Sequence, residues 1–221
     1  MSDAAELALS GSNLTADVPF SVALRTAGTV HALQPAAGER GDLARLTADV
    51  CARAGLRPEQ VGTIRLDVGP GSYTGLRVAV TFVRFLQHFG GVRVLAIDSL
   101  LWLAARAGVD DGRVVALLDA RRDRFHRGVF SRDGNGVLQP LLPSAALPLA
   151  EVLLELRVGD RCVLPTALAT QLEPELRARG ATCLPAAGLL ATELFAADLP
   201  FTRPSAAELL PRYLMASYAE G

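Results

Sequence analysis

Apolar and polar residues alternate with two distinct periods along the first half of the chain. Short runs with a period of two predict β-strands at residues 5–10, 19–25, 28–34, 62–68 and 92–97. Longer stretches with helical spacing predict helices at 42–54 and 75–89, and another that begins at Asp98 or Ser99. Three strands followed by alternating helices and strands predict a mixed sheet with helices on its faces.

The second half of the chain begins in the same order. Strands are predicted at 112–119, 124–131, 137–140, 161–164 and 181–184, and helices at 148–156, 167–179 and 188–197. Asp133-Gly134-Asn135-Gly136 is typical of a hairpin turn, and the proline-rich stretch 140–148 is interpreted as a surface connection.

This order of elements is that of the RNase H-like fold, the unit from which the actin-like (ASKHA) superfamily is built. We therefore predict an α/β, actin-like two-lobe fold in which mixed sheets are flanked by helices. The lobes are predicted to be residues 1–105 and a smaller lobe of residues 106–221, with the boundary in the region 98–111.

The predicted helix at 75–89 is apolar around an unusually wide arc. At 100° per residue its apolar side chains cover roughly 220°, whereas a helix on one sheet face needs little more than ~100°. Its apolar residues are Leu76, Val78, Ala79, Val80, Phe82, Val83, Phe85, Leu86 and Phe89. The helix is therefore predicted to be buried on two sides, by its own sheet and by either a neighbouring helix or a partner protein.

The predicted helix at 42–54 carries a charged strip. Arg45, Asp49 and Arg53 are spaced four residues apart and so share one face. Such a strip is either a solvated face or a rim that gives specificity to an adjoining apolar interface.

The most distinctive segment is a glycine-rich turn between a strand and a helix. It reads Gly69-Pro70-Gly71-Ser72-Tyr73-Thr74-Gly75-Leu76-Arg77. The backbone N–H groups of this turn could bind an anion. Thr74 is predicted to cap the helix that follows, and the N-terminus of that helix would also favour an anion. Alternatively, its glycines let the helix and the sheet approach closely. It is not a P-loop, because the Gly-Lys-Ser/Thr sequence is missing.

Composition narrows the chemistry further. The 221 residues carry a net charge of −1, and all 22 basic residues are arginine, which excludes lysine chemistry. The three cysteines and three histidines are too dispersed for a metal site, and no nucleophile–base arrangement is apparent. Asp119, at a strand end, could bind a metal or pair with Arg121 or Arg124. Neither a secretion signal nor a membrane-spanning stretch is recognisable, so a cytoplasmic location is expected.

Several segments together resemble the TsaB (YeaZ) family of bacterial tRNA threonylcarbamoyladenosine biosynthesis proteins. These are GPGSYTGLR with its apolar helix, VRVLAIDSL, VVALLDARRDRFHRGVFSRDGNG, and Leu210-Pro211-Arg212-Tyr213-Leu214 near the C-terminus. The likeness extends over most of the chain in the same order, and the glycine-rich turn is its most specific part.

The resemblance implies a two-lobe actin-like subunit without catalysis of its own. It would act with the transferase TsaD and the ATPase TsaE, which modify the adenosine beside the anticodon, and would contact tRNA only indirectly. ATP or ADP and metal would be held by those partners. The family docks through the first two helices of the N-terminal lobe, which implies an interface of Arg45, Asp49, Arg53, Val78, Phe82, Phe85, Leu86 and Phe89. The same face would support a homodimer.

Two departures from the family pattern bear on nucleotide binding. Ser10 stands where the superfamily has a phosphate-site aspartate, and Glu39 or a neighbour stands where the family has histidine. The loop from Ser10 to Ser21 also is longer than usual. Both substitutions favour a scaffold, and the alternative is a divergent actin-like ATPase or small-molecule kinase.

Overall fold

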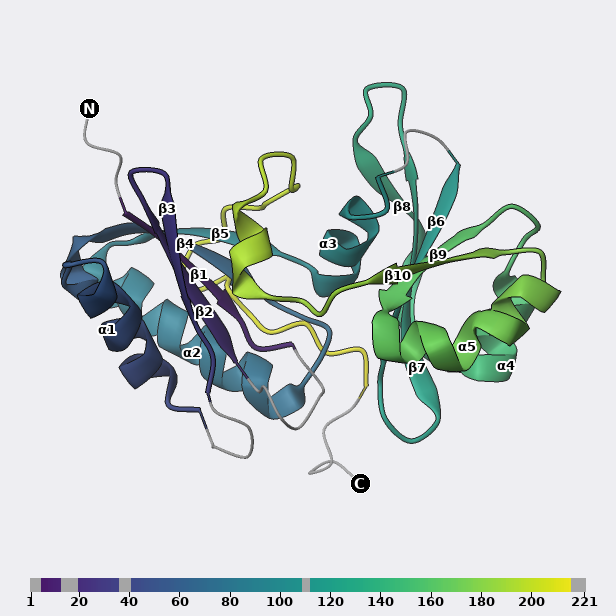
Figure 1. Ribbon diagram of the computed structural model, residues 1–221, viewed down its shortest axis with the longest axis horizontal. Helices are drawn as coiled ribbons and strands as arrows, with labels where there is room; N and C mark the ends of the chain where they lie inside the picture. Colours follow the sequence, from purple (N-terminus) through teal and green to yellow (C-terminus); the bar gives the residue numbers. More distant parts are fainter. Residues whose placement is uncertain (1–4, 13–19, 36–40, 109–111, 216–221) are drawn as a thin grey trace. The chain divides into compact units, whose positions relative to one another are not determined.

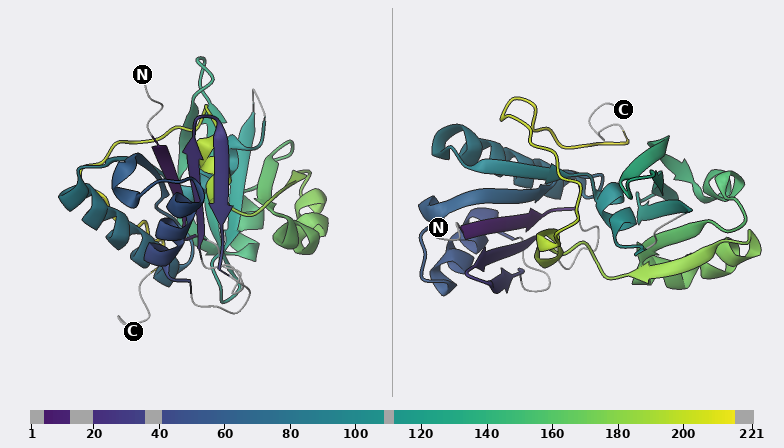
Figure 2. Two further views of the ribbon diagram at one scale, coloured as in Figure 1. Left: turned by 60° about the vertical axis from the view of Figure 1, so that its left-hand side comes forward. Right: turned by 90° about the horizontal axis from the view of Figure 1, so that it is seen from above.

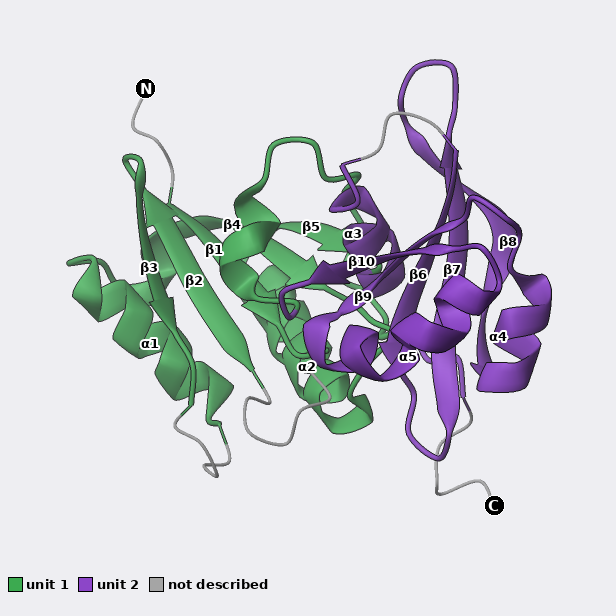
Figure 3. Ribbon diagram, turned by 45° about the vertical axis from the view of Figure 1, so that its right-hand side comes forward, with its two compact units in different colours: residues 1–98, 189–212 green, residues 99–188, 213–221 purple. Residues whose placement is uncertain are grey.

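A computed structural model describes residues 5–12, 20–35, 41–108 and 112–215. The chain forms two compact units, residues 1–98 with 189–212 and residues 99–188 with 213–221 (Figure 3). The crossing at Asp98–Ser99 lies within the predicted boundary region. The units differ from the predicted lobes because residues 189–212 return to the N-terminal sheet, where Leu209 enters the core and Thr202 pairs with Ala96.

The first unit contains a five-stranded sheet in the order β3-β2-β1-β4-β5. Its strands are β1 (Ala5–Ser10), β2 (Ser21–Thr26), β3 (Thr29–Leu33), β4 (Val61–Asp67) and β5 (Arg93–Ile97). β1 pairs antiparallel with β2 and parallel with β4. β2 pairs antiparallel with β3, and β4 pairs parallel with β5. This is the mixed sheet that the order of elements predicts.

Helices α1 (Leu43–Arg53) and α2 (Tyr73–Gly90) pack on one face of this sheet (Figures 1 and 2). Alternation along β1 sends Leu7 and Leu9 toward the helices and Glu6 toward the other face. On that second face lies the short 3-10 helix η2 (Ala191–Phe195), whose Phe195 ring stacks 4.7 Å from the Arg25 guanidinium carbon. Another 3-10 turn, η1 (Pro58–Gln60), precedes β4.

The second unit repeats the same topology in the order β10-β9-β6-β7-β8. Its elements are α3 (Ser99–Ala105), β6 (Arg113–Asp119), β7 (Arg124–Arg132), β8 (Leu138–Pro148), α4 (Leu149–Glu155), β9 (Arg161–Pro165), α5 (Thr166–Ala178) and β10 (Thr182–Ala186). Residues of α4 and α5 pack with β6, β7 and β9 in one apolar core, while Leu100 of α3 lies against Gly128 of β7.

Two predictions for the second half of the sequence are wrong. Residues 140–148 are not a connection but most of strand β8. β8 is an edge strand, so its prolines need not donate hydrogen bonds to a further neighbour, and the register against β7 shifts near Arg127 and Val129. The helix predicted at 188–197 is only the five-residue η2, because the three-residue spacing of Ala191 and Leu194 fits a single 3-10 stretch against the sheet.

Candidate functional site

Helix α2 begins at the glycine-rich turn, and Ser72 is its N-cap. The Ser72 hydroxyl accepts a hydrogen bond from the Gly75 N–H at 3.2 Å. The prediction that Thr74 caps this helix is therefore wrong. Thr74 already lies in the first turn with its side chain exposed.

The turn is pressed against the loop that follows β1. A Cβ atom on Gly75 would lie 2.2 Å from the Gly11 carbonyl oxygen, and one on Gly71 would lie 2.5 Å from the Ser12 carbonyl oxygen. The Ser72 N–H donates to that Ser12 oxygen at 3.2 Å. Gly69 has φ of +100° and donates its N–H to the carboxylate of Asp67 at 3.0 Å. These contacts favour the second interpretation of the turn, a close joint between helix and sheet.

Helix α2 has a buried face and an exposed apolar ridge. The buried face of Leu76, Ala79, Val80 and Val83 packs inward. On the outer side Val78, Phe85 and Phe89 are 42%, 59% and 72% exposed, and Phe82 between them is half-buried. We call these four outer residues the apolar stripe.

The apolar stripe confirms that the helix has two apolar sides. Its members follow one another at the spacing i, i+4, i+7, i+11, so they lie along one line of the helix. The Phe85 and Phe89 rings are in contact, with centroids 4.7 Å apart. Leu86, which was also predicted to face a partner, is half-buried and packs against the core of the first unit.

A segment distant in the sequence flanks the apolar stripe. Arg84 donates from Nε to the Ala206 carbonyl oxygen, and Gln87 donates to the Pro204 carbonyl oxygen, both at 2.9 Å. A hollow of about 400 Å³ lies here, lined by Thr81, Arg84, Phe85, His88, Ala206 and Ala207. Sequence analysis missed the contribution of residues 204–207, because no local pattern indicates which helix an extended segment will cross.

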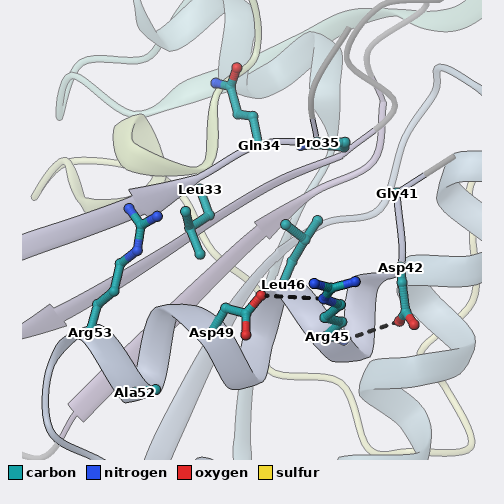
Figure 4. Close-up of a pocket in the computed structure, with 10 residues that line it drawn as sticks. All are labelled: Leu33, Gln34, Pro35, Gly41, Asp42, Arg45, Leu46, Asp49, Ala52 and Arg53. Atoms are coloured by element: carbon teal, nitrogen blue, oxygen red, sulfur yellow. Dashed lines mark hydrogen bonds and ion pairs between the residues drawn. The ribbon is translucent and has the colours of Figure 1, made fainter. Parts of the chain in front are cut away.

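The charged strip of α1 lines a different hollow, of about 640 Å³ (Figure 4). The structure does bring Arg45, Asp49 and Arg53 together there, opposite Leu33 at the end of edge strand β3. Arg45 and Asp49 are 3.7 Å apart and well exposed, so their ion pair contributes only about 0.3–0.5 kcal/mol. Residues of the apolar stripe do not line this hollow, so the charged strip and the apolar stripe lie at different hollows.

The carboxyl ends of β1, β4 and β5 form the edge at which α/β proteins commonly bind ligands. Two carboxylates at this edge, those of Asp67 and Asp98, form contacts within the chain. The buried Asp67 carboxylate accepts hydrogen bonds from the Ser10 hydroxyl at 3.1 Å and from the Gly69 N–H. Asp98 forms an ion pair with Arg212, whose own N–H donates to the Val68 carbonyl oxygen at 2.7 Å. The described residues contain no group of three or more histidine, cysteine, aspartate or glutamate side chains that could hold a metal ion.

The remaining residues that were singled out from the sequence either form contacts within their own turn, are exposed on α2, or lie outside the described residues. The Asp119 carboxylate accepts a hydrogen bond from the Arg121 N–H at 2.7 Å, at the start of a tight turn between β6 and β7. Arg77 is exposed near the start of α2. Glu39 and most of the loop between Ser10 and Ser21 lie outside the described residues. None of the helices in the described ranges has the length and hydropathy to span a bilayer.

Comparison with known proteins gives consistent matches. Residues 40–161 match the family described as TsaD, tRNA N6-adenosine threonylcarbamoyltransferase. The chain is 35% identical over 109 residues to the tRNA threonylcarbamoyladenosine biosynthesis protein TsaB of Bacillus subtilis, covering 49% of this chain and 47% of that protein. It is 29% identical over 128 residues to the TsaB of Escherichia coli, covering 56% and 55%. The matches thus span about half the length of these curated relatives.

The structural likeness extends over nearly all of the chain. YeaZ from Pseudomonas aeruginosa superposes with a TM-score of 0.71 at 26% sequence identity, over 97% of this chain and 100% of that one. The structural match therefore extends well beyond the half of the chain that the sequence matches cover.

Proposed function

Because the chain belongs to the TsaD family of tRNA N6-adenosine threonylcarbamoyltransferases, we propose that it is the TsaB-type subunit of a threonylcarbamoyladenosine-forming complex. In this role it docks on a TsaD-type transferase, supports its activity on the adenosine beside the anticodon, and does not catalyse the transfer. The names of its relatives from Bacillus subtilis and Escherichia coli support this assignment.

The apolar stripe on α2 carries the proposal. Isolated exposed apolar residues are common on proteins, but aligned aromatic side chains on one helix are typical of an interface. Phe85 and Phe89 are the aromatic anchors, of the kind that contribute most of the binding energy at such interfaces. Burial of these two rings against a partner contributes a favourable free energy of about 25 cal/mol for each Å² of apolar surface that is removed from water.

The contacts at the carboxyl ends of β1, β4 and β5 favour a scaffolding role for this chain over a catalytic one. Ser10 donates to Asp67, and Asp98 is paired with Arg212, so these carboxylates stabilise the unit's own loops. In the proposed complex, nucleotide and metal are held by the transferase and by a TsaE-type ATPase. The competing proposal of an actin-like ATPase or kinase predicts micromolar binding and turnover of Mg-ATP by the isolated chain, which calorimetry measures.

The test is co-expression with the TsaD-type transferase of the same organism, followed by size exclusion. We expect a complex with the wild-type chain and at least a 100-fold weaker one with Phe85→Glu, because the interface then buries an unpaired charge costing about 3 kcal/mol or more. Phe85 is 59% exposed, so the fold should tolerate the change. Phe82→Glu also is expected to disrupt the complex, but Phe82 is half-buried and that variant would disturb folding too.

Leu154→Glu is the matched control. Leu154 is 74% exposed on α4 of the second unit, and its replacement should leave the complex intact. The threonylcarbamoyladenosine content of tRNA, in a strain whose only TsaB-type subunit is the variant, should fall with Phe85→Glu and not with the control. A complex that survives Phe85→Glu, or no complex with the wild-type chain, would contradict the proposal.

A further inference from the structure

A basic stripe runs beside the apolar stripe on α2. Arg77, Thr81, Arg84 and His88 each precede a member of the apolar stripe by one residue, and all four are exposed. They therefore repeat at the same i, i+4, i+7, i+11 spacing on the adjoining side of the helix. Helix α2 contains no aspartate or glutamate between Tyr73 and Gly90. We call Arg77, Arg84 and His88 the basic stripe.

The two arginines of the basic stripe have no acidic partner within the described residues. Arg77 and Arg84 form no ion pair there, and the hydrogen bond from Arg84 to Ala206 goes to a neutral carbonyl oxygen. The acidic residue of the flanking segment, Glu208, accepts hydrogen bonds from the Ser205 N–H at 2.9 Å and the Ser205 hydroxyl at 2.8 Å. Its carboxylate is thus engaged within its own turn.

The hollow at this place has mainly apolar walls, and Arg84 and His88 are among the residues that line it. The other residues that line it are Thr81, Phe85, Ala206 and Ala207. The bond from Nε to the Ala206 oxygen orients the Arg84 guanidinium before any partner arrives. Less side-chain entropy is then lost when a carboxylate binds to it.

We propose that the partner helix covering the apolar stripe is acidic along the side that faces Arg77 and Arg84, with one of its carboxylates in contact with the Arg84 guanidinium. This inference rests on the proposed function and identifies the chemistry of the partner surface. Complementary charge of this kind raises the association rate and sets the register of the two helices.

A second copy of this chain fits the surface less well. Its α2 offers the same basic stripe and no acid. The acids of α1 have partners within that helix, since Asp42 accepts a hydrogen bond from the Arg45 N–H and Asp49 forms an exposed ion pair with the Arg45 side chain. The charge pattern therefore favours a different, acidic protein over self-association.

The absence of lysine from the chain permits a direct test. In Arg84→Lys the introduced side chain is the sole lysine, and a carbodiimide joins its amine to a carboxylate in contact by an amide bond while the carbodiimide takes up the elements of water. We expect a covalent product with the TsaD-type transferase, in which peptide mass spectrometry finds the introduced lysine joined to an aspartate or glutamate of the partner. Arg179→Lys, exposed at the end of α5, is the control and should give no such product.

A second experiment measures association rates at low and high salt. The double variant Arg77→Gln/Arg84→Gln should associate about 10-fold more slowly than wild type at low salt, and this difference should shrink at high salt. Arg179→Gln should match wild type. If the complex forms but shows neither the cross-linked product of Arg84→Lys nor a salt-dependent difference, the acidic-partner inference is overturned while the proposed function stands. If the wild-type chain forms no complex, the proposed function and the acidic-partner inference are both contradicted. A cross-linked product between two copies of this chain would overturn the inference in favour of self-association.

Discussion

The imidazole of His126 on β7 is buried in the second unit and only 5% exposed. Its Nδ1 has no hydrogen-bond partner within the part of the chain that is described. Burial lowers the pKa of His126 from 6.5 to about 4, and the negative charge of Asp119 opposes this only in part. The side chain is therefore neutral in the folded protein at pH values where an unfolded chain would protonate it.

This burial predicts that stability falls as the solution is acidified. Below pH 6.5 the unfolded chain binds a proton at His126 that the folded protein does not bind until about pH 4, so the free energy of unfolding decreases across that interval. Between pH 7 and pH 5 we expect a loss of about 2 kcal/mol from this residue. Urea unfolding of wild type and His126→Gln at both pH values measures it.

His31→Gln, on edge strand β3, serves as the control because that imidazole is only partly buried. His126→Gln should lose most of the wild-type pH dependence, and a loss of similar size in His31→Gln would contradict its assignment to His126. Equal pH dependence in wild type and His126→Gln would show that other groups are responsible.

Helix α2 illustrates how far periodicity predicts an element. Its predicted range of 75–89 lies inside the observed Tyr73–Gly90, and its two apolar sides follow from spacing alone. Its N-cap did not follow, because Ser72 and Thr74 are both good capping residues. The choice depends on where the turn meets Ser12 and Gly11, which are far away in the sequence.

The N-cap assignment predicts different effects for two similar substitutions. Ser72→Ala removes the oxygen that accepts from the Gly75 N–H and should lower the free energy of unfolding by about 1 kcal/mol. Thr74→Ala removes an exposed side chain and should change it by no more than about 0.5 kcal/mol. Urea unfolding of both variants compares them, and an equal or reversed effect would place the cap at Thr74 after all.

The C-terminal segment ties the first unit together. Thr202 pairs with Ala96 on β5, Arg84 and Gln87 hold the following residues against α2, and Leu209 is 1% exposed within the core formed by the N-terminal sheet and helices. The docking surface proposed above is therefore built from α2 and residues 204–207, which are far apart in the sequence.

Leu209→Ala should destabilise the first unit by about 2–4 kcal/mol, because it leaves a cavity in that core. The adjacent Leu210 is 58% exposed, so Leu210→Ala should cost no more than about 0.5 kcal/mol. Hydrogen exchange localises the effect: amides of β5 and α2 should lose protection in Leu209→Ala, while those of β6 and β9 keep it. Uniform loss of protection across both units would contradict this arrangement.

Local patterns in the sequence are sufficient for the order of strands and helices, the repeated topology, and the apolar stripe of α2, because alternation and helical spacing record which side of an element avoids water. They also carry the glycine-rich turn on which the family resemblance rests.

Local patterns misassign β8, because prolines indicate the end of a strand unless that strand is known to lie at the edge of a sheet. Tertiary contacts alone decide that Leu209 belongs to the first core, that Ala206 faces Arg84, and that the α1 strip and the apolar stripe lie at separate hollows. Such contacts join residues far apart in the chain, and the free energy that selects them belongs to the packed core and not to any local segment.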